Sequence, residues 1–293
     1  MKKNLMLYFI ILLNFLLFAD NDFFNIPTGI TLTLATEQSV INNNSLSLVS
    51  NPALMSDTKK IFLFEYNKIF YFAQTNYDSI GLSFGKNNKI GIVLNKFSSG
   101  EIKIRDIDGL LTNETINYSL TSITAGVSLS FELYNKKHIL NIGTAESFVF
   151  DNLIPDTSRF FTNLATTYSF YNNSFVKTLR FGFVIKGINY SQLATYHLGF
   201  LVKTGSLSLI NGYENRISDN TNGKIKIALL FDFPLLINNK IYFGLGYSFA
   251  QNSYSDIITS GFGISFKGII FNYSYLIHES LGSINSVQIG SEF

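Results

Sequence analysis

The chain has 293 residues, of which 46% are hydrophobic and 15% aromatic, and it contains no Cys. The lack of Cys excludes disulfides, thiolate metal sites, a cysteine nucleophile and a lipidated N-terminal cysteine. The 22 Lys and Arg exceed the 20 Asp and Glu by two, and two lysines lie at positions 2 and 3. The remainder is therefore neutral and has no basic run of the kind that binds nucleic acid.

The N-terminal residues have the pattern of a secretory signal. Lys2 and Lys3 form a positive start, residues 6–18 form an apolar core, and Ala19 offers a cleavage position before Asp20. The alternative is a transmembrane anchor, which is disfavoured because the apolar run is short for a span. We predict that residues 1–19 are a signal peptide and that the protein is exported.

Residues 20–58 are irregular and rich in Asn, Ser and Thr, and Asn51-Pro52-Ala53 lies near their end. A first apolar stretch covers residues 60–75, and from about residue 78 to Phe293 segments of about ten residues alternate apolar with small or polar side chains. Residues 240–249 show the alternation clearly, with Ile241, Phe243, Leu245, Tyr247 and Phe249 on one face. A period of two indicates β-strands with one apolar face. Repeated around a closed sheet with the apolar face outward, the pattern is typical of a transmembrane β-barrel.

The alternation predicts about fourteen antiparallel strands, an even number as in bacterial single-chain barrels. We expect strands at 60–75, 79–85, 89–97, 123–133, 138–149, 161–170, 178–188, 195–203, 206–213, 224–232, 240–249, 257–266, 269–276 and 284–293. The stretch 60–75 could hold one strand or two. Short connectors alternate with long ones, and the long ones are expected at 100–118, 151–159, 214–223, 250–256 and 277–283. This rhythm predicts tight periplasmic turns and longer outer loops.

Five charged residues fall on the polar faces of two predicted strands. Arg180 and Lys186 do so in 178–188, and Lys224, Lys226 and Asp232 do so in 224–232. Because a lipid-facing Arg or Lys costs about 2–4 kcal/mol at the bilayer midplane, we expect these side chains to point into the lumen. They would pair with each other or with a segment inside the barrel, or alternatively form a selectivity lining.

Patterns that suggest catalysis are weak. Gly81-Leu82-Ser83-Phe84-Gly85 matches the serine-hydrolase motif, but that motif needs a strand-to-helix turn and Ser83 lies in a predicted strand that enters a hairpin. His138, His197 and His278 are far apart in sequence; His197 is expected to face the lumen and His278 to lie in an outer loop. We predict no catalytic residue, no metal site and no cofactor.

Asp106-Ile107-Asp108-Gly109 shares part of a calcium-loop pattern but lacks its third acidic position and its spacing, so we interpret it as a loop turn. At the other end of the chain, Val287, Ile289 and Phe293 alternate along the last predicted strand. A final strand that ends in Phe resembles the signal by which the barrel-insertion machinery recognises outer-membrane proteins. The alternative is an ordinary strand that ends in Phe.

The position of Asn51-Pro52-Ala53, between the N-terminal segment and the first strand, resembles the Asn-Pro-Ala element of the FadL superfamily. Phe97-Ser98-Ser99-Gly100-Glu101-Ile102, followed by Asp106-Ile107-Asp108-Gly109, is similar to the strand end and first large loop of its PorV/PorQ branch. Leu281-Gly282-Ser283 is also similar to that branch. The resemblance implies a fourteen-stranded outer-membrane barrel whose residues 20–58 fold into the lumen as a hatch, with the barrel at 59–293.

Three functions are open at this point. The leading one is a non-enzymatic PorV/PorQ-type protein that serves secretion or surface attachment of other proteins, which the resemblance links to type IX secretion. The alternative is a FadL-like channel for long-chain fatty acids or other hydrophobic compounds. The third is a structural barrel or an outer-membrane enzyme. The expected partners are outer-membrane lipids, the insertion machinery, and either secreted proteins or a hydrophobic small molecule.

Overall fold

The computed structural model describes residues 30–34, 37–41, 44–71, 75–105, 111–134, 137–152, 159–172, 175–189, 194–236, 239–250, 256–278 and 282–293. The predicted signal peptide, the first part of the predicted hatch and the Asp106–Gly109 motif lie outside these ranges. Within them, no helix has the length and apolar character needed to cross a membrane.

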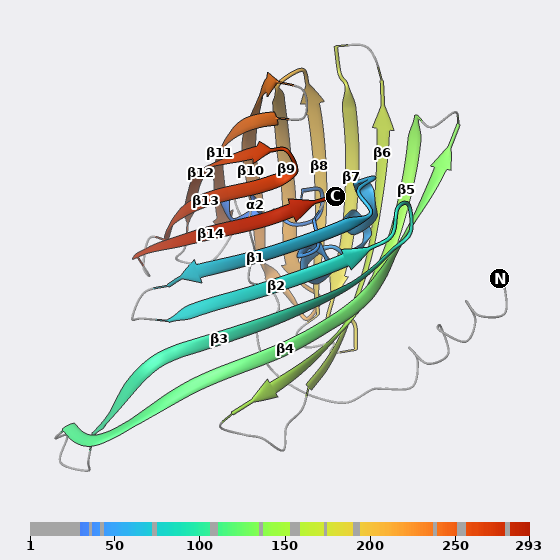
Figure 1. Ribbon diagram of the computed structural model, residues 1–293. Coiled ribbons are helices and arrows are strands. Elements are labelled where there is room, and N and C mark those ends of the chain that lie inside the picture. The colour runs from blue at the N-terminus through green and yellow to red at the C-terminus, as the bar shows by residue number, and fades with distance from the viewer. Residues whose placement is uncertain are drawn as a thin grey trace.

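Fourteen antiparallel strands form one closed barrel in which every strand pairs with its neighbours in sequence (Figure 1). The prediction of the fold class and of the strand number is confirmed. The strands are β1 (Phe62–Phe70), β2 (Asn76–Phe84), β3 (Lys89–Arg105), β4 (Leu111–Leu133), β5 (His138–Asp151), β6 (Arg159–Tyr171), β7 (Thr178–Lys186), β8 (Thr195–Thr204), β9 (Leu207–Arg216), β10 (Asp219–Leu236), β11 (Asn239–Ala250), β12 (Ile257–Phe266), β13 (Ile269–His278) and β14 (Gly282–Glu292).

The first and last strands close the barrel. β1 pairs with β14 from Leu63 opposite Glu292 to Phe70 opposite Asn285. Beyond this ladder, the Phe293 carbonyl accepts hydrogen bonds from the backbone N–H groups of Ile61 and Phe62, at 2.8 and 3.1 Å. Closure therefore pairs β1 and β14, so the seam presents no free strand edge, whose unpaired backbone groups an apolar surrounding would penalise heavily.

The two faces of the wall differ as the alternation predicts. On β11, Phe243 and Leu245 are 50% and 56% exposed, whereas Tyr242 and Ser248 are 6% and 1% exposed. The other strands repeat this arrangement, with Ile, Leu and Phe outside and Ser, Thr and Asn inside. The exterior is therefore apolar and the interior mostly polar, which is the reverse of a soluble protein.

The connectors at the two ends of the barrel differ in length. One end, which we call the tight-turn end, holds the connectors 85–88, 134–137, 172–177, 205–206, 237–238 and 267–268. The other, which we call the long-connector end, holds 71–75, 106–110, 152–158, 187–194, 217–218, 251–256 and 279–281. Short and long connectors alternate only in part. At the long-connector end 217–218 and 279–281 are short, whereas 172–177 at the tight-turn end has six residues. The connector 217–218 is short because β9 and β10 extend through most of the predicted 214–223 loop.

Two further boundaries correct the predictions. The expected loop 100–118 is largely strand, because β3 continues to Arg105 and β4 starts at Leu111. These segments pair with each other beyond the last residues of β2 and β5 that pair with them, Asn76 and Asp151. Figure 1 shows the resulting hairpin reaching past the neighbouring strands. The prediction that His278 lies in an outer loop is wrong, since it is the last residue of β13 and pairs with Ile257 and Gly282.

A chain segment that precedes the strands fills the interior. The described residues between 30 and 58, which we call the inner segment, include the short helices α2 (Ile30–Thr33), α3 (Ser47–Ser50) and η2 (Pro52–Asp57). Its residues are almost all buried, and they contact strands on opposite sides of the barrel, including β4, β7 and β13. Figure 1 shows this segment enclosed by the strands. Whether residues 20–58 form a single hatch stays a prediction.

Candidate functional site

The inner segment packs directly against glycine residues of the barrel wall. A Cβ atom added to Gly143 of β5 would lie 2.3 Å from the Pro52 carbonyl carbon and 2.4 Å from Ala53 N. A Cβ atom on Gly182 of β7 would lie 2.0 Å from the carbonyl oxygen of Ser39. Both contacts are with backbone, which cannot swing away as a side chain can. Glycine at these positions therefore allows the inner segment to lie directly against the wall.

The Asn51-Pro52-Ala53 element shapes the inner segment. The Asn51 side chain caps η2 by accepting a hydrogen bond from Ala53 N at 3.0 Å. Its amide nitrogen donates to the carbonyl oxygen of Ser39 at 2.6 Å, which ties two parts of the segment together. The Ser128 hydroxyl of β4 donates to the Ala53 carbonyl oxygen at 3.0 Å. The element thus folds the inner segment and fixes it to the wall, with Pro at a position where a helix start tolerates it.

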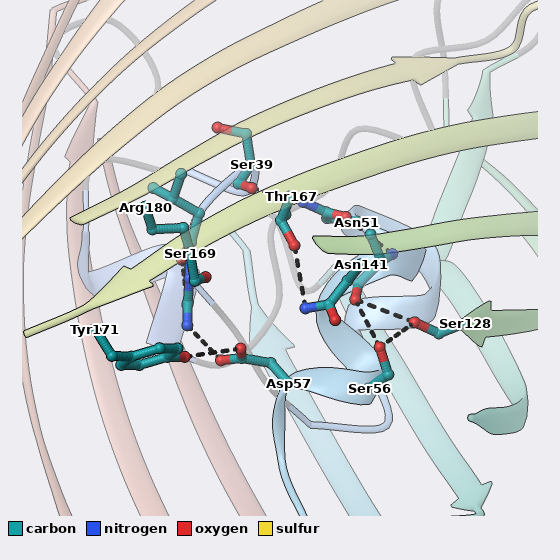
Figure 2. A network of polar contacts seen from close by, with 12 residues as sticks. Ser39, Asn51, Ser56, Asp57, Ser128, Asn141, Thr167, Ser169, Tyr171 and Arg180 are labelled. Carbon is teal, nitrogen blue, oxygen red and sulfur yellow. Dashed lines mark hydrogen bonds and ion pairs between the residues drawn. The ribbon is translucent and has the colours of Figure 1, made fainter. Parts of the chain in front are cut away.

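Arg180 joins β7 to two parts of the inner segment, as Figure 2 shows. Its guanidinium forms an ion pair with Asp57 and donates to the Val40 carbonyl oxygen at 3.0 Å. It also donates to the Ser169 hydroxyl of β6 at 3.0 Å. Tyr171 reaches Asp57 at 3.4 Å from the same side. A buried guanidinium needs this many partners, because any donor left unpaired would keep its full desolvation cost.

A second cluster of charged residues lies on the inner faces of β7 to β10. Lys226 and Glu214 form an ion pair at 2.5 Å, and His197 Nδ1 lies 3.5 Å from the same carboxylate. Lys186 donates to the side-chain oxygen of Gln38 in the inner segment. Lys186, His197 and Lys226 are each almost completely buried. The barrel interior thus holds its charges in pairs and hydrogen bonds, which is what keeps buried charge tolerable.

The remaining predicted charges lie on the same inner surface. Lys224 is half-buried on β10, and Asp232 pairs with Lys203 of β8. The sequence-based selection missed three residues that form ion pairs with selected ones. These are Asp57, Glu214 and Lys203, the partners of Arg180, Lys226 and Asp232. Lys203 could have been found because it alternates with the apolar face of its strand. Asp57 could not, because the inner segment has no period that shows which way its side chains point.

A polar cavity of about 370 Å³ opens at the tight-turn end of the interior. Its wall includes the Arg180–Asp57 and Lys203–Asp232 pairs together with Lys240. Apolar side chains such as Leu230 also contribute. This cavity therefore offers both charges and apolar surface between the inner segment and the wall.

The long-connector end of the interior is apolar instead. Leu32 of α2 packs there with inward-facing side chains from several strands, and we call this set the apolar cluster: Leu32, Ile69, Tyr77, Leu120, Val149, Phe161, Leu276 and Ile284. Tyr71, Phe97, Tyr118 and Ile257 pack around it. Many other inward positions carry Ser, Thr or Asn, so the cluster interrupts the polar lining of the barrel. A second apolar set lies nearer the tight-turn end: Leu34, Val40, Ile41, Leu201, Ile210, Ala228, Leu230 and Tyr242.

The serine and histidine residues considered as catalytic candidates do not lie together in the structure. Ser83 is buried in β2, which continues into a hairpin turn to β3 and into no helix. His138 starts β5 and contacts Tyr168, far along the sheet from His197. The described ranges contain no group of three side chains that could hold a metal ion.

The residues of the predicted insertion signal lie on the outside of β14. Ile289 and Phe293 are exposed, and Val287 is half-buried on the same face. Their use by an insertion machinery stays a prediction.

No family model matches the sequence, and no curated protein matches it either. Solved structures do share the fold. The toluene transporter TodX of P. putida has a TM-score of 0.57 at 10% identity, over 92% of this chain and 98% of TodX. The toluene transporter TbuX of Ralstonia pickettii has a TM-score of 0.56 at 7% identity, over 90% and 98%. A FadL homologue of Pseudomonas aeruginosa has a TM-score of 0.51 at 11% identity, over 92% and 99%.

Proposed function

We propose that the protein is an outer-membrane channel for small hydrophobic molecules. Its apolar exterior suits a hydrocarbon surrounding, and its closed wall leaves no unpaired strand edge there. The solved structures that share its fold are described as toluene transporters and a FadL homologue, which supports transport over catalysis. This proposal favours the channel alternative over the secretion reading.

The observation that carries the proposal is the apolar cluster inside the long-connector end. A water-filled pore for polar solutes would gain nothing from Leu, Ile, Val and Phe side chains facing the lumen. A hydrophobic molecule would gain by leaving water for such a surface, by about 25 cal/mol per Å² of apolar area buried. The side chains of the cluster are buried against Leu32 of α2, so the proposal requires α2 to shift for a ligand to take its place and to pass deeper into the barrel.

A tryptophan reporter tests the proposal, because the chain contains no Trp. Phe97→Trp places an indole beside the apolar cluster, where Phe97 packs against Tyr118 with ring centroids 6.2 Å apart. Phe262→Trp is the matched control, because Phe262 lies on the exterior. We expect toluene or palmitate to change the emission of the Phe97→Trp protein in detergent micelles and to saturate. Leu32→Asn should weaken that response at least about tenfold by removing apolar surface.

The two reporters separate binding from a change in the micelle. Equal, unsaturable responses of Phe97→Trp and Phe262→Trp would show that toluene and palmitate only enter the detergent. That result would contradict the channel proposal.

A second candidate function rests on the hairpin formed by the ends of β3 and β4. These ends pair with each other past the neighbouring strands, from Glu101 opposite Asn117 to Arg105 opposite Leu111. A projecting hairpin offers surface and strand edges to another protein. Such a contact would suit a PorV/PorQ-type partner of secreted proteins, as the sequence resemblance implies.

Shortening this hairpin distinguishes the two functions. Joining Ser99 to Tyr118 by a two-residue turn removes the projection and leaves the pairing of Ser98 with Ser119 intact. In a strain that lacks the protein, the secretion function predicts that exported proteins stay in the periplasm when the shortened chain is supplied and reach the surface with the full chain. Normal secretion with the shortened chain would exclude this candidate, and ligand binding in the micelle assay would be unaffected.

A further inference from the structure

Charge is segregated between the two ends of the barrel. The connectors at the tight-turn end contain lysines and neither Asp nor Glu: Lys86, Lys136, Lys137, Lys177 and Lys267. The connectors at the long-connector end contain acidic residues and neither Lys nor Arg: Asp106, Asp108, Asp156, Asp256 and Glu279. The two sets of connectors thus carry opposite charge, which gives the barrel an electrical polarity along its axis.

Four of the lysines, which we call the lysine ring, are described and exposed: Lys86, Lys137, Lys177 and Lys267. Among the described residues, none of the four forms an ion pair. Lys267 lies along the exterior, with its Nζ 5.4 Å from the centroid of the Phe266 ring. Near the tight turns, the acidic residue Glu132 at the end of β4 is exposed. The acidic residues Asp57, Asp232 and Glu292 line the interior cavity instead. The ring is thus available to an anionic partner outside the barrel.

Exposed aromatic side chains lie just above the lysine ring on the exterior. Phe84, Phe266 and Phe293 are half to two-thirds exposed close to the tight turns. Aromatic residues of this kind mark the membrane–water interface of outer-membrane barrels. Lys86 and Lys267 follow Phe84 and Phe266 by two residues and one residue, which puts them at the depth of lipid head groups, with long side chains able to reach outward. Lys137 and Lys177 lie in the turns of the same end.

We propose that the lysine ring binds the anionic head groups of phospholipids in the leaflet at the tight-turn end. This inference rests on the proposed membrane location. The four lysines belong to four different turns, between β2 and β3, β4 and β5, β6 and β7, and β12 and β13. Three of these turns are consecutive, and the fourth lies on the other side of the β1–β14 seam, so the lysines follow the arc of the wall from β12 through β1 to β7. Lipids that surround the barrel can contact the whole of such an arc, which a small docked acidic protein would not cover. Each lysine near an anionic surface adds to the attraction, and salt screens it.

Spin-labelled lipids test the inference on the full chain in phosphatidylcholine vesicles. The fraction of immobilised label is measured for phosphatidylglycerol and for phosphatidylcholine. We expect the protein to prefer phosphatidylglycerol about threefold, and about 1 M NaCl to remove the preference. Replacing all four lysines of the ring by Gln should also remove the preference for phosphatidylglycerol. Replacing all four by Arg should retain that preference. Lys96→Gln, an exposed lysine toward the other end of β3, should leave it unchanged.

Two results would overturn the inference. One is an equal affinity of the unaltered protein for both lipids. The other is a preference that the Gln variant retains. If neither label is immobilised, the barrel is not in the bilayer, and the membrane location itself is wrong. Unchanged lipid selectivity combined with loss of an acidic soluble partner in the Gln variant would assign the lysine ring to protein contact instead.

Discussion

Arg180 shows how a single residue can hold the inner segment in the barrel. Its guanidinium is buried and its only anionic partner among the described residues is Asp57. Removing one member of a buried ion pair leaves the other without compensation. The contacts of Arg180 with Val40 and Ser169 cannot replace a carboxylate, because both are neutral acceptors.

We predict that Asp57→Ala lowers the free energy of unfolding by about 3–5 kcal/mol, as measured by urea titration in detergent micelles. Lys68→Ala is the control, because Lys68 and Asp78 form a half-exposed pair at 3.7 Å. The loss there should stay below about 1 kcal/mol. Equal losses in the two variants would mean that Arg180 does not depend on Asp57.

Gly143 makes a second prediction at the scale of one residue. Gly143→Ala would place a methyl group against the backbone of Pro52 and Ala53, so the inner segment must move away from β5. Because the chain has no Cys, Ser56→Cys provides a single label site on the buried segment. We expect a maleimide to label Cys at position 56 at least about tenfold faster in the Gly143→Ala protein, in line with the cost of overpacking.

Ala125→Val is the matched control for Gly143→Ala. It adds carbon atoms to the exposed outer face of β4, on the neighbouring strand. Labelling at position 56 should then keep its original rate. Unchanged labelling in the Gly143→Ala protein as well would show that the inner segment does not press on β5.

At the scale of the strand, the outer faces should tolerate charge only near the barrel ends. Leu245 lies in the middle of β11 and Leu207 at the tight-turn start of β9, and both are exposed on the outside. We predict that Leu245→Arg destabilises the protein in vesicles by about 2–4 kcal/mol, and that Leu207→Arg costs about 0–1 kcal/mol. The measurement is the free energy of unfolding in phosphatidylcholine vesicles. A larger loss for Leu207→Arg would contradict the proposed depth of the barrel in the membrane.

The sequence predicts the strands where one face is buried, because burial then imposes a two-residue period of apolar and polar side chains. Where neither face is buried, that period is absent and the strands were missed. Residues 123–133 alternate strictly, because one face meets an apolar surrounding and the other the interior. Residues 99–105 and 111–119 also form strands, yet they pair only with each other beyond the barrel wall. No apolar face is required there, so the sequence reads as a polar loop. The same reason explains the missed start of β10 at Asp219, because β11 pairs with β10 only from Lys224. It does not explain the missed end of β9 at Arg216, which pairs with Thr195 of β8.

The inner site was less predictable than the wall. The alternation placed Arg180, Lys186 and Lys226 on inward faces, but it did not indicate that Asp57, Glu214 and Gln38 are their partners. Asp57 and Gln38 come from the inner segment, far from Arg180 and Lys186 in sequence. Glu214 lies on the strand next to Lys226, in a stretch predicted as a loop. The apolar cluster escaped notice for a related reason, because it combines one inward residue from each of several strands with Leu32.

At the scale of the whole molecule, Phe293 extends the seam between β1 and β14 that closes the barrel. The Phe293 backbone exchanges hydrogen bonds with Phe62, and the two rings stack with centroids 6.4 Å apart. We predict that deleting Phe293 reduces the fraction of folded barrel in cells at least about threefold, since unpaired backbone at the seam is costly in hydrocarbon. Migration of unheated samples on a denaturing gel measures that fraction.

Phe293→Tyr is the control for this deletion, because it keeps the backbone and the ring. The folded fraction should then stay close to that of the unaltered protein. Equal folding of the deletion variant would show that closure, and the predicted insertion signal, do not need Phe293.

The inner segment leads directly into β1, and β1 completes the wall by pairing with β14, the strand most distant from it in sequence. The closing contact therefore carries the largest chain entropy to overcome, and it forms after the local hairpins. We expect the inner segment to be inside before that contact forms, because the described strands then make a closed wall. Correct packing of the inner segment is therefore expected to be a condition for closure. A chain whose inner segment is misplaced is expected to stay an open, aggregation-prone sheet.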